Sequence, residues 1–261
     1  MQSHVTRATR VARIVLLLVM PLSTSAVAAG NAVTPYRPSV SNPAQLPAPG
    51  QLELEFGGLS LRDSAQRQDS LPYLLKLAFD PQWGVLLGGQ AFVRQTQQDT
   101  GARARGVGDT NLILKRAFLI DEATAFGLEL GAKIPTARND IGSGRADYTL
   151  NGIASRDFGR LHLDVNLNAT HVGLAEVGTG TVQSGASASF SHPLSGQFAA
   201  TAELSGARRS GTPSTAQLLL ALTYSPSKQL TIDLGIVRGL NPASPTLGLF
   251  TGLVVPLAQL W

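Results

Sequence analysis

Apolar and polar residues alternate one by one along much of the chain after residue 50. The clearest run is 161–170, in which leucine, valine and alanine take all the odd positions, and His162, Asp164 and Asn166 lie among the even ones. Because successive side chains of a β-strand point to opposite faces, this run predicts a strand with one apolar and one polar face. Similar runs begin near Leu52, Tyr73, Trp83, Val107, Phe126, Asp147, Val182, Phe198, Thr215, Leu230 and Leu247.

The connections between these runs alternate in length. The longer ones are 62–70, 95–105, 135–146, 171–180, 208–214 and 239–246, and the tight ones are 80–82, 121–122, 158–159 and 225–227, with 191–196 a little longer. A soluble β-sandwich or barrel would also alternate, but it has no reason to sort its connections by length. Short periplasmic turns and longer extracellular loops are typical of outer-membrane barrels. We therefore expect an all-β fold: a transmembrane antiparallel up-and-down β-barrel of about twelve strands over residues 51–261, in a bacterial outer membrane.

Bulk composition agrees with this fold class. Charged residues make up 15% of the chain and hydrophobic residues 43%. After the first thirty residues, no stretch approaches the 18 consecutive apolar residues of a transmembrane helix.

Pro256 is an awkward residue for a strand of a closed barrel, because it lacks an N–H group. We therefore expect the last strand to end near Val255.

The first fifty residues carry two other signals. Residues 1–29 combine Arg7, Arg10 and Arg13, an apolar run at Ile14–Met20, and the small-x-small sequence 26–28. This pattern predicts a cleaved secretory signal peptide. Residues 30–50 contain five prolines, so they fit neither a helix interior nor a central strand. We interpret them as an extended periplasmic leader that serves as a linker.

Charge and cysteine content exclude several classes of function. The three arginines of the signal peptide supply most of the net charge of +4, so the mature chain is nearly neutral and no nucleic-acid partner is expected. The chain has no cysteine, which excludes disulfides, thiolate nucleophiles and Cys-ligated metals. We expect no cofactor and no metal site.

If the apolar parity of the strands faces lipid, the opposite parity lines the lumen. A Lys or Arg facing lipid at mid-depth would cost roughly 2–4 kcal/mol, which fixes this choice of faces. Such residues would form either the wall of a solute path or a salt-bridged filling of the bore. The lumen-lining candidates are Glu53, Lys76, Arg94, Asp109, Asn111, Lys115, Glu129, Lys133, Asp147, His162, Asp164, Asn166, Glu203 and Asp233.

His162 and Asp164 share a strand face and raise the possibility of catalysis. A catalytic triad would also need a nucleophile, and nothing in the sequence marks one. Asn166 continues the same face, which favours a hydrogen-bonded lumen. We therefore expect no enzyme, and we keep a lipid-hydrolysing barrel and a closed structural barrel as alternatives.

Two stretches resemble an outer-membrane transporter family named for the meta-pathway of phenol degradation. The first is the Gly-Val-Gly-Asp sequence at 106–109, followed by Lys115. The second is 131–136, ending in Pro-Thr, followed by the Gly-rich sequence 142–144 and Asp147. The resemblance implies a barrel that passes aromatic or other hydrophobic compounds. We expect passive passage of small solutes, with outer-membrane lipid and lipopolysaccharide as the surroundings.

Overall fold

A computed structural model describes residues 30–261, and the predicted signal peptide lies outside the described residues. Residues 31–261 form one compact unit. Within this range the chain has thirteen β-strands. They are β1 (Gln51–Arg62), β2 (Gln66–Ala78), β3 (Trp83–Gln97), β4 (Arg103–Gly106), β5 (Thr110–Leu119), β6 (Thr124–Ile134), β7 (Asp147–Phe158), β8 (Leu161–His171), β9 (Val182–Pro193), β10 (Phe198–Arg209), β11 (Thr215–Ser227), β12 (Leu230–Gly239) and β13 (Leu247–Gln259).

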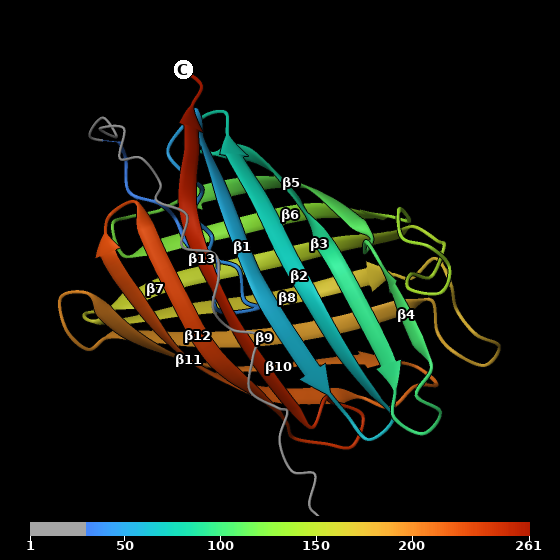
Figure 1. Cartoon of the computed structure of the whole chain (residues 1–261). Coiled ribbons are helices and arrows are strands. Elements are labelled where there is room, and N and C mark those ends of the chain that lie inside the picture. Colours follow the sequence, from blue (N-terminus) through green and yellow to red (C-terminus); the bar gives the residue numbers. More distant parts are fainter. Residues whose placement is uncertain (1–29) are drawn as a thin grey trace, which may run out of the picture. The chain divides into compact units, whose positions relative to one another are not determined.

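The strands close into a single antiparallel barrel (Figure 1). β1 pairs with β2 on one side and with β13 on the other, which joins the first and last strands. β4 and β5 pair with the same edge of β3, β4 beside Val93–Thr96 and β5 beside Trp83–Gly89. They occupy one position in the barrel, interrupted at residues 107–109. The ring therefore has twelve positions, which confirms the predicted up-and-down barrel.

Apolar side chains cover the outer face of the barrel. Leu130, Leu167 and Leu234 are more than half exposed, whereas Glu129, Asn166 and Asp233 next to them are buried. This arrangement reverses the order of a soluble protein, in which large apolar side chains lie inside. It is the arrangement expected when hydrocarbon surrounds the barrel. The outer surface is therefore that of a membrane-embedded barrel.

Among residues 30–261, no helix has the length and apolar character needed to cross a membrane.

Connection length separates the two ends of the barrel (Figure 1). Residues 79–82, 120–123, 159–160, 194–197 and 228–229 form short turns at the end where the C-terminus lies. The opposite end carries the longer loops 135–146, 172–181 and 240–246. By the outer-membrane rule the first end is periplasmic and the second extracellular.

The predicted long connection at 62–70 is wrong. β1 and β2 continue toward each other and leave only the turn 63–65, where Asp63 Oδ1 accepts hydrogen bonds from the backbone N–H groups of Ala65 and Gln66. Charged residues in this stretch suggested a loop, but they belong to paired strands. The start predicted near Val107 lies at Thr110, because residues 107–109 interrupt the strand.

The expected end of the last strand near Val255 is also wrong, since β13 continues to Gln259. Pro256 lies beyond the last pair between β12 and β13, Thr231 with Val254, so no ladder on that side needs its missing N–H. Its other neighbour is Glu53 of β1, next to a register shift. A proline is tolerated in a sheet at such a place.

Candidate functional site: the barrel lumen and its N-terminal segment

Residues 34–46, which we call the luminal segment, lie inside the barrel (Figure 1). Tyr36 and Ala44 are essentially inaccessible to solvent, with exposed fractions of 2% and 0%. The prediction that this Pro-rich stretch is a periplasmic linker is therefore wrong. Proline excludes it from a sheet, but its remaining N–H groups find partners on the lumen wall.

A cluster of buried charges surrounds Tyr36. Lys76 Nζ lies 3.0 Å from Glu53 and 2.6 Å from Glu55, and it also donates to the backbone carbonyl of Thr34. Lys115 Nζ lies 3.1 Å from Glu129. The two ammonium groups lie 4.4 and 4.2 Å from the centre of the Tyr36 ring.

These contacts place the Tyr36 ring between two cations, where cation–π attraction adds to the ion pairs. The Tyr36 hydroxyl donates a 2.8 Å hydrogen bond to the Gln45 carbonyl. The ring face and the hydroxyl thus both fix Tyr36 inside the bore.

Arg37 joins the segment to β12, which is separated from β1 only by β13. Its guanidinium makes two hydrogen bonds to Asp233, Nε to Oδ2 at 2.8 Å and Nη2 to Oδ1 at 2.9 Å. Gly57 and Gly252 are paired across β1 and β13 beneath this side chain. A Cβ at Gly252 would lie 2.3 Å from Arg37 Nε, and one at Gly57 would lie 3.0 Å from its Cζ. The two glycines therefore leave room for the guanidinium.

Three further wall residues anchor the middle of the segment. Glu203 Oε2 accepts the backbone N–H groups of Val40 and Ser41 at 2.8 and 2.9 Å. Asn166 Oδ1 accepts the N–H of Asn42 at 3.0 Å. Ser155 Oγ accepts the N–H of Ala44. The Asn42 side chain donates to Glu129, and the Asn42 carbonyl accepts a hydrogen bond from the Asn166 side chain. The segment is thus held by side chains from several strands around the ring.

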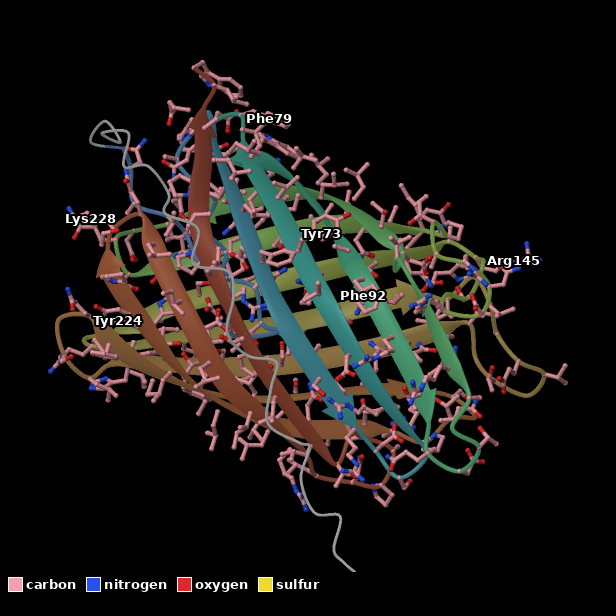
Figure 2. All side chains as sticks on the ribbon, in the orientation of Figure 1. Tyr73, Phe79, Phe92, Arg145, Tyr224 and Lys228 are labelled. Carbon is pink, nitrogen blue, oxygen red and sulfur yellow. The ribbon has the colours of Figure 1, made fainter. Side chains whose placement is uncertain are left out.

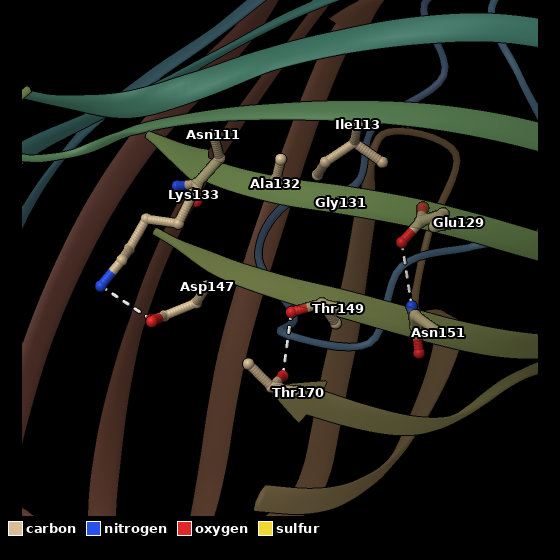
Figure 3. Close-up of a pocket in the computed structure, with 10 residues that line it drawn as sticks. All are labelled: Asn111, Ile113, Glu129, Gly131, Ala132, Lys133, Asp147, Thr149, Asn151 and Thr170. Atoms are coloured by element: carbon tan, nitrogen blue, oxygen red, sulfur yellow. Dashed lines mark hydrogen bonds and ion pairs between the residues drawn. The ribbon is translucent and has the colours of Figure 1, made fainter. Parts of the chain in front are cut away.

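Cavities remain between this segment and the extracellular end. One of about 230 Å³ is lined by residues of β5 to β8, and Figure 3 shows it with Lys133 directed at Asp147. It shares Asn111 and Lys133 with a cavity of about 440 Å³, and Asn151 with one of about 300 Å³. We call the three together the vestibule. Its wall combines polar and charged side chains with apolar ones, among them Ile113 and Ile141.

In the vestibule, the ammonium group of Lys133 lies between two carboxylates. Lys133 Nζ lies 2.7 Å from Asp147 and 3.6 Å from Asp109, and 3.0 Å from the Ser143 hydroxyl. Asp109 Oδ1 also accepts the N–H of Ala137 at 3.0 Å, which holds the 135–146 loop over the lumen edge. A Cβ at Gly142 would lie 2.9 Å from Asp109 Oδ1, so this loop glycine allows the close approach.

These residues belong to the two stretches that carry the family resemblance. Thr136 Oγ1 lies 2.9 Å from Thr110 Oγ1 and donates to the Gly108 carbonyl at 3.3 Å. Stretches 106–109 and 131–147 therefore form one structure at the extracellular mouth. Their residue types are explained by a loop that packs against an interrupted strand.

The structure brings the predicted lumen residues together in two groups. Next to the luminal segment lie Glu53, Lys76, Lys115, Glu129, Asp164, Asn166, Glu203 and Asp233, and His162 lies beside Asp164. At the vestibule lie Asp109, Asn111, Lys133 and Asp147.

Arg94 does not join either group, and its assignment to the lumen is wrong. The β2–β3 register pairs Pro72 with Gln90 and Leu71 with Phe92, so Ala91 is an extra residue on β3. A β-bulge of this kind shifts every later side chain to the other face. Arg94 therefore lies on the outer face, half exposed and 2.8 Å from Asp69.

The hydrogen bonds around His162 do not follow the order of a catalytic triad. His162 Nδ1 lies 2.6 Å from Asp157 and its Nε2 lies 3.1 Å from Asp164. Ser155 donates its hydroxyl to Asp164 and accepts the N–H of Ala44. A serine nucleophile needs its hydroxyl hydrogen-bonded to the base, whereas here Ser155 is bonded to the acid.

The sequence interpretation missed Tyr36, Arg37 and Asn42. One signal was available: the predicted lumen set contains more carboxylates than bases, so part of the compensating charge had to come from elsewhere. A linker has little use for an arginine, a tyrosine and an asparagine between its prolines. The small residues at Gly57 and Gly252, by contrast, carry no meaning until their partner is known.

No protein-family model matches the sequence, and no curated protein matches it. Solved structures resemble the fold. An outer membrane channel from Pseudomonas putida F1 has a TM-score of 0.65 at 13% identity, covering 82% of this chain and 98% of that one. The KdgM porin has a TM-score of 0.53 at 8% identity, covering 79% and 99%. The NanC porin has a TM-score of 0.54 at 9% identity, covering 78% and 99%. This chain therefore has the fold of outer-membrane channels and porins.

Proposed function

We propose that this protein is an outer-membrane channel for small solutes that is closed by its own N-terminal segment. The observation that carries the proposal is the division of the lumen. A vestibule lined by both polar and apolar residues lies on the extracellular side, and the luminal segment fills the bore beyond it. Passage from the vestibule to the periplasm requires the segment to move.

The way the segment is held is compatible with such movement. Apart from buried Tyr36, Pro43 and Ala44, its contacts with the wall are largely hydrogen bonds and ion pairs, which water can replace. It also lacks strand pairing of its own between residues 34 and 46. The barrel wall can therefore stay intact while the segment shifts. Transport would be diffusion down a gradient, because the sequence has no nucleotide-binding motif.

The vestibule sets the class of solute. Its charged residues include Lys133 between Asp109 and Asp147, which can pair with polar groups of either sign, and Ile113 and Ile141 offer apolar contact. The resemblance of 106–109 and 131–147 to the phenol-degradation transporter family supports an aromatic or similarly apolar compound with a polar substituent. The proposal includes membership of this protein in that family.

Conductance in planar lipid bilayers tests the proposal. The wild-type protein is compared with the double variant Arg37→Gln/Asp233→Asn, which removes both charges of the pair so that neither is left buried without its partner. We expect a low mean conductance for the wild type and a several-fold higher one for the double variant. If neither protein conducts while both show heat-modifiable migration on a denaturing gel, the barrel is a closed structural one and the channel proposal fails.

A further inference from the structure

The outer face of the barrel carries a group of arginines at the extracellular end of β1 to β4. Two rows of neighbouring residues contain them. In one row, Arg62 of β1 pairs with Arg67 of β2, and Arg67 pairs with Thr96 of β3. Thr96 in turn pairs with Arg103 of β4. In the next row Ser60, Asp69, Arg94 and Arg105 are neighbours on successive strands. The arginine patch, as we call it, consists of Arg62, Arg67, Arg94, Arg103 and Arg105, all exposed.

These side chains share the outer face because of the strand registers. β1 and β2 pair without a shift from Leu52 to Arg62, so the buried pair Glu53–Lys76 and the pair Ser60–Asp69 point to opposite sides. The extra residue Ala91 then turns Arg94 outward beside Asp69. Arg105 also points outward, because it is paired with Arg94.

Asp69 is the carboxylate within the two rows, and it orients two of the arginines. Arg67 lies 2.9 Å and Arg94 2.8 Å from its two oxygens, and the Ser60 hydroxyl donates to it at 2.7 Å. One acid cannot neutralise five guanidinium groups. The patch therefore keeps an excess of positive charge, and Asp69 holds part of it in a fixed geometry.

The patch borders the apolar belt. The pair Leu71 and Phe92 lies two residues further along β2 and β3 from Asp69 and Arg94, on the same outer face, and each is 38% exposed. Figure 2 shows Phe92 and Tyr73 on this face of the barrel. Side chains that directly follow the hydrocarbon belt lie at the depth of the lipid headgroups. Guanidinium groups at that depth can bind phosphate by paired hydrogen bonds.

We propose that the arginine patch is a binding site for the phosphate groups of an outer-leaflet glycolipid, of the lipopolysaccharide class. The inference rests on the outer-membrane location in the proposed function, because only there does the long-loop end meet this lipid. Acyl chains would lie on Leu71, Phe92 and Tyr73, and phosphates on Arg94, Arg105 and their neighbours. The site would fix the protein to its surrounding lipid at β1 to β4, away from the lumen.

Binding of bisphosphorylated lipid A to the purified mature protein in detergent tests the proposal, measured by native mass spectrometry. Arg94→Gln/Arg105→Gln is the test variant. Arg208→Gln is the matched control, because Arg208 is an exposed, outward residue at the same end of the barrel and pairs with Ser184. We expect at least about tenfold weaker binding for the test variant, from the loss of charge-assisted hydrogen bonds. The control should bind like the wild type.

Two further binding measurements distinguish the phosphate groups of the lipid from its other parts and from free phosphates. Dephosphorylated lipid A should bind the wild type no better than it binds the test variant. Millimolar pyrophosphate should compete only weakly, because it lacks acyl chains; complete displacement would assign the patch to free phosphates and overturn the lipid proposal. Equal binding by wild type and test variant would also overturn it. Conductance plays no part in these measurements, so a failed channel proposal leaves the result interpretable.

Discussion

Arg37 and Asp233 form a two-point ion pair between the luminal segment and β12, although 196 residues separate them in the chain. The Asp233 side chain is fully buried, and that of Arg37 is 17% exposed. A carboxylate in such a place needs a partner, since an isolated buried charge is strongly unfavourable. The wall residue and the segment residue therefore depend on each other, which couples occupancy of the bore to the stability of the barrel.

The glycines beneath Arg37 give a steric test of this coupling. In Gly252→Ala the new methyl group would lie 2.3 Å from Arg37 Nε, so the guanidinium must shift or leave. We expect a higher conductance in planar bilayers and a loss of stability of about 1–3 kcal/mol from overpacking. Gly58→Ala is the control, because a Cβ at Gly58 has no atom within 4 Å. Wild-type conductance in Gly252→Ala would speak against a closing role for Arg37.

Lys76 is expected to be important for stability. Lys76→Met leaves Glu53 and Glu55 next to each other without their shared cation, both in buried positions. Removing one partner of a buried pair typically costs about 3–5 kcal/mol. The urea midpoint of unfolding in detergent should fall accordingly. Arg138→Gln breaks the exposed pair with Asp140 and should change stability by less than about 1 kcal/mol; equal effects of the two variants would contradict the assigned geometry.

Ion selectivity reports on the vestibule. Lys133→Gln leaves Asp109 and Asp147 without the cation between them, so the vestibule becomes more negative and attracts cations. In a KCl gradient the reversal potential should move toward the equilibrium potential of K⁺. The variants are compared in a background with raised conductance, such as Gly252→Ala.

Arg94→Gln is the control for this measurement and also tests the bulge at Ala91. The sequence pattern places Arg94 in the lumen, whereas the register places it outside. Its substitution should leave the reversal potential unchanged. A shift as large as that of Lys133→Gln would return Arg94 to the lumen wall.

The fold could be predicted because strand patterning is local. The alternation in residues 161–170 needs no knowledge of the neighbouring strands, and burial of Asp164 and Asn166 follows directly from it. The starts expected at Trp83, Asp147 and Val182 coincide with β3, β7 and β9. Register shifts are different, because a bulge depends on both strands of a pair; the extra residue Ala91 has no signature that distinguishes it from its neighbours.

The content of the lumen could be predicted only in part. Parity placed Glu53, Lys76 and Lys115 inside the barrel, but it could not show what they contact. The luminal segment has no periodicity, so composition alone suggested a linker. Its position follows from long-range partners such as Glu203 with Ser41, which are visible only once the ring is closed.

A reversible cross-link between the luminal segment and the wall tests most directly whether this segment closes the channel. The Ala44 N–H donates to Ser155 Oγ at 2.8 Å, so the two residues are in contact, and the chain has no cysteine of its own. Ala44→Cys/Ser155→Cys therefore introduces a single thiol pair, and thiol titration verifies the cross-link before conductance is measured. This pair is made in the Gly252→Ala background, with each single cysteine as a control. We predict low conductance when the pair is oxidised and a several-fold rise after reduction, with no redox response in the controls. Equal conductance in the oxidised and reduced states would show that solutes pass without movement of the segment.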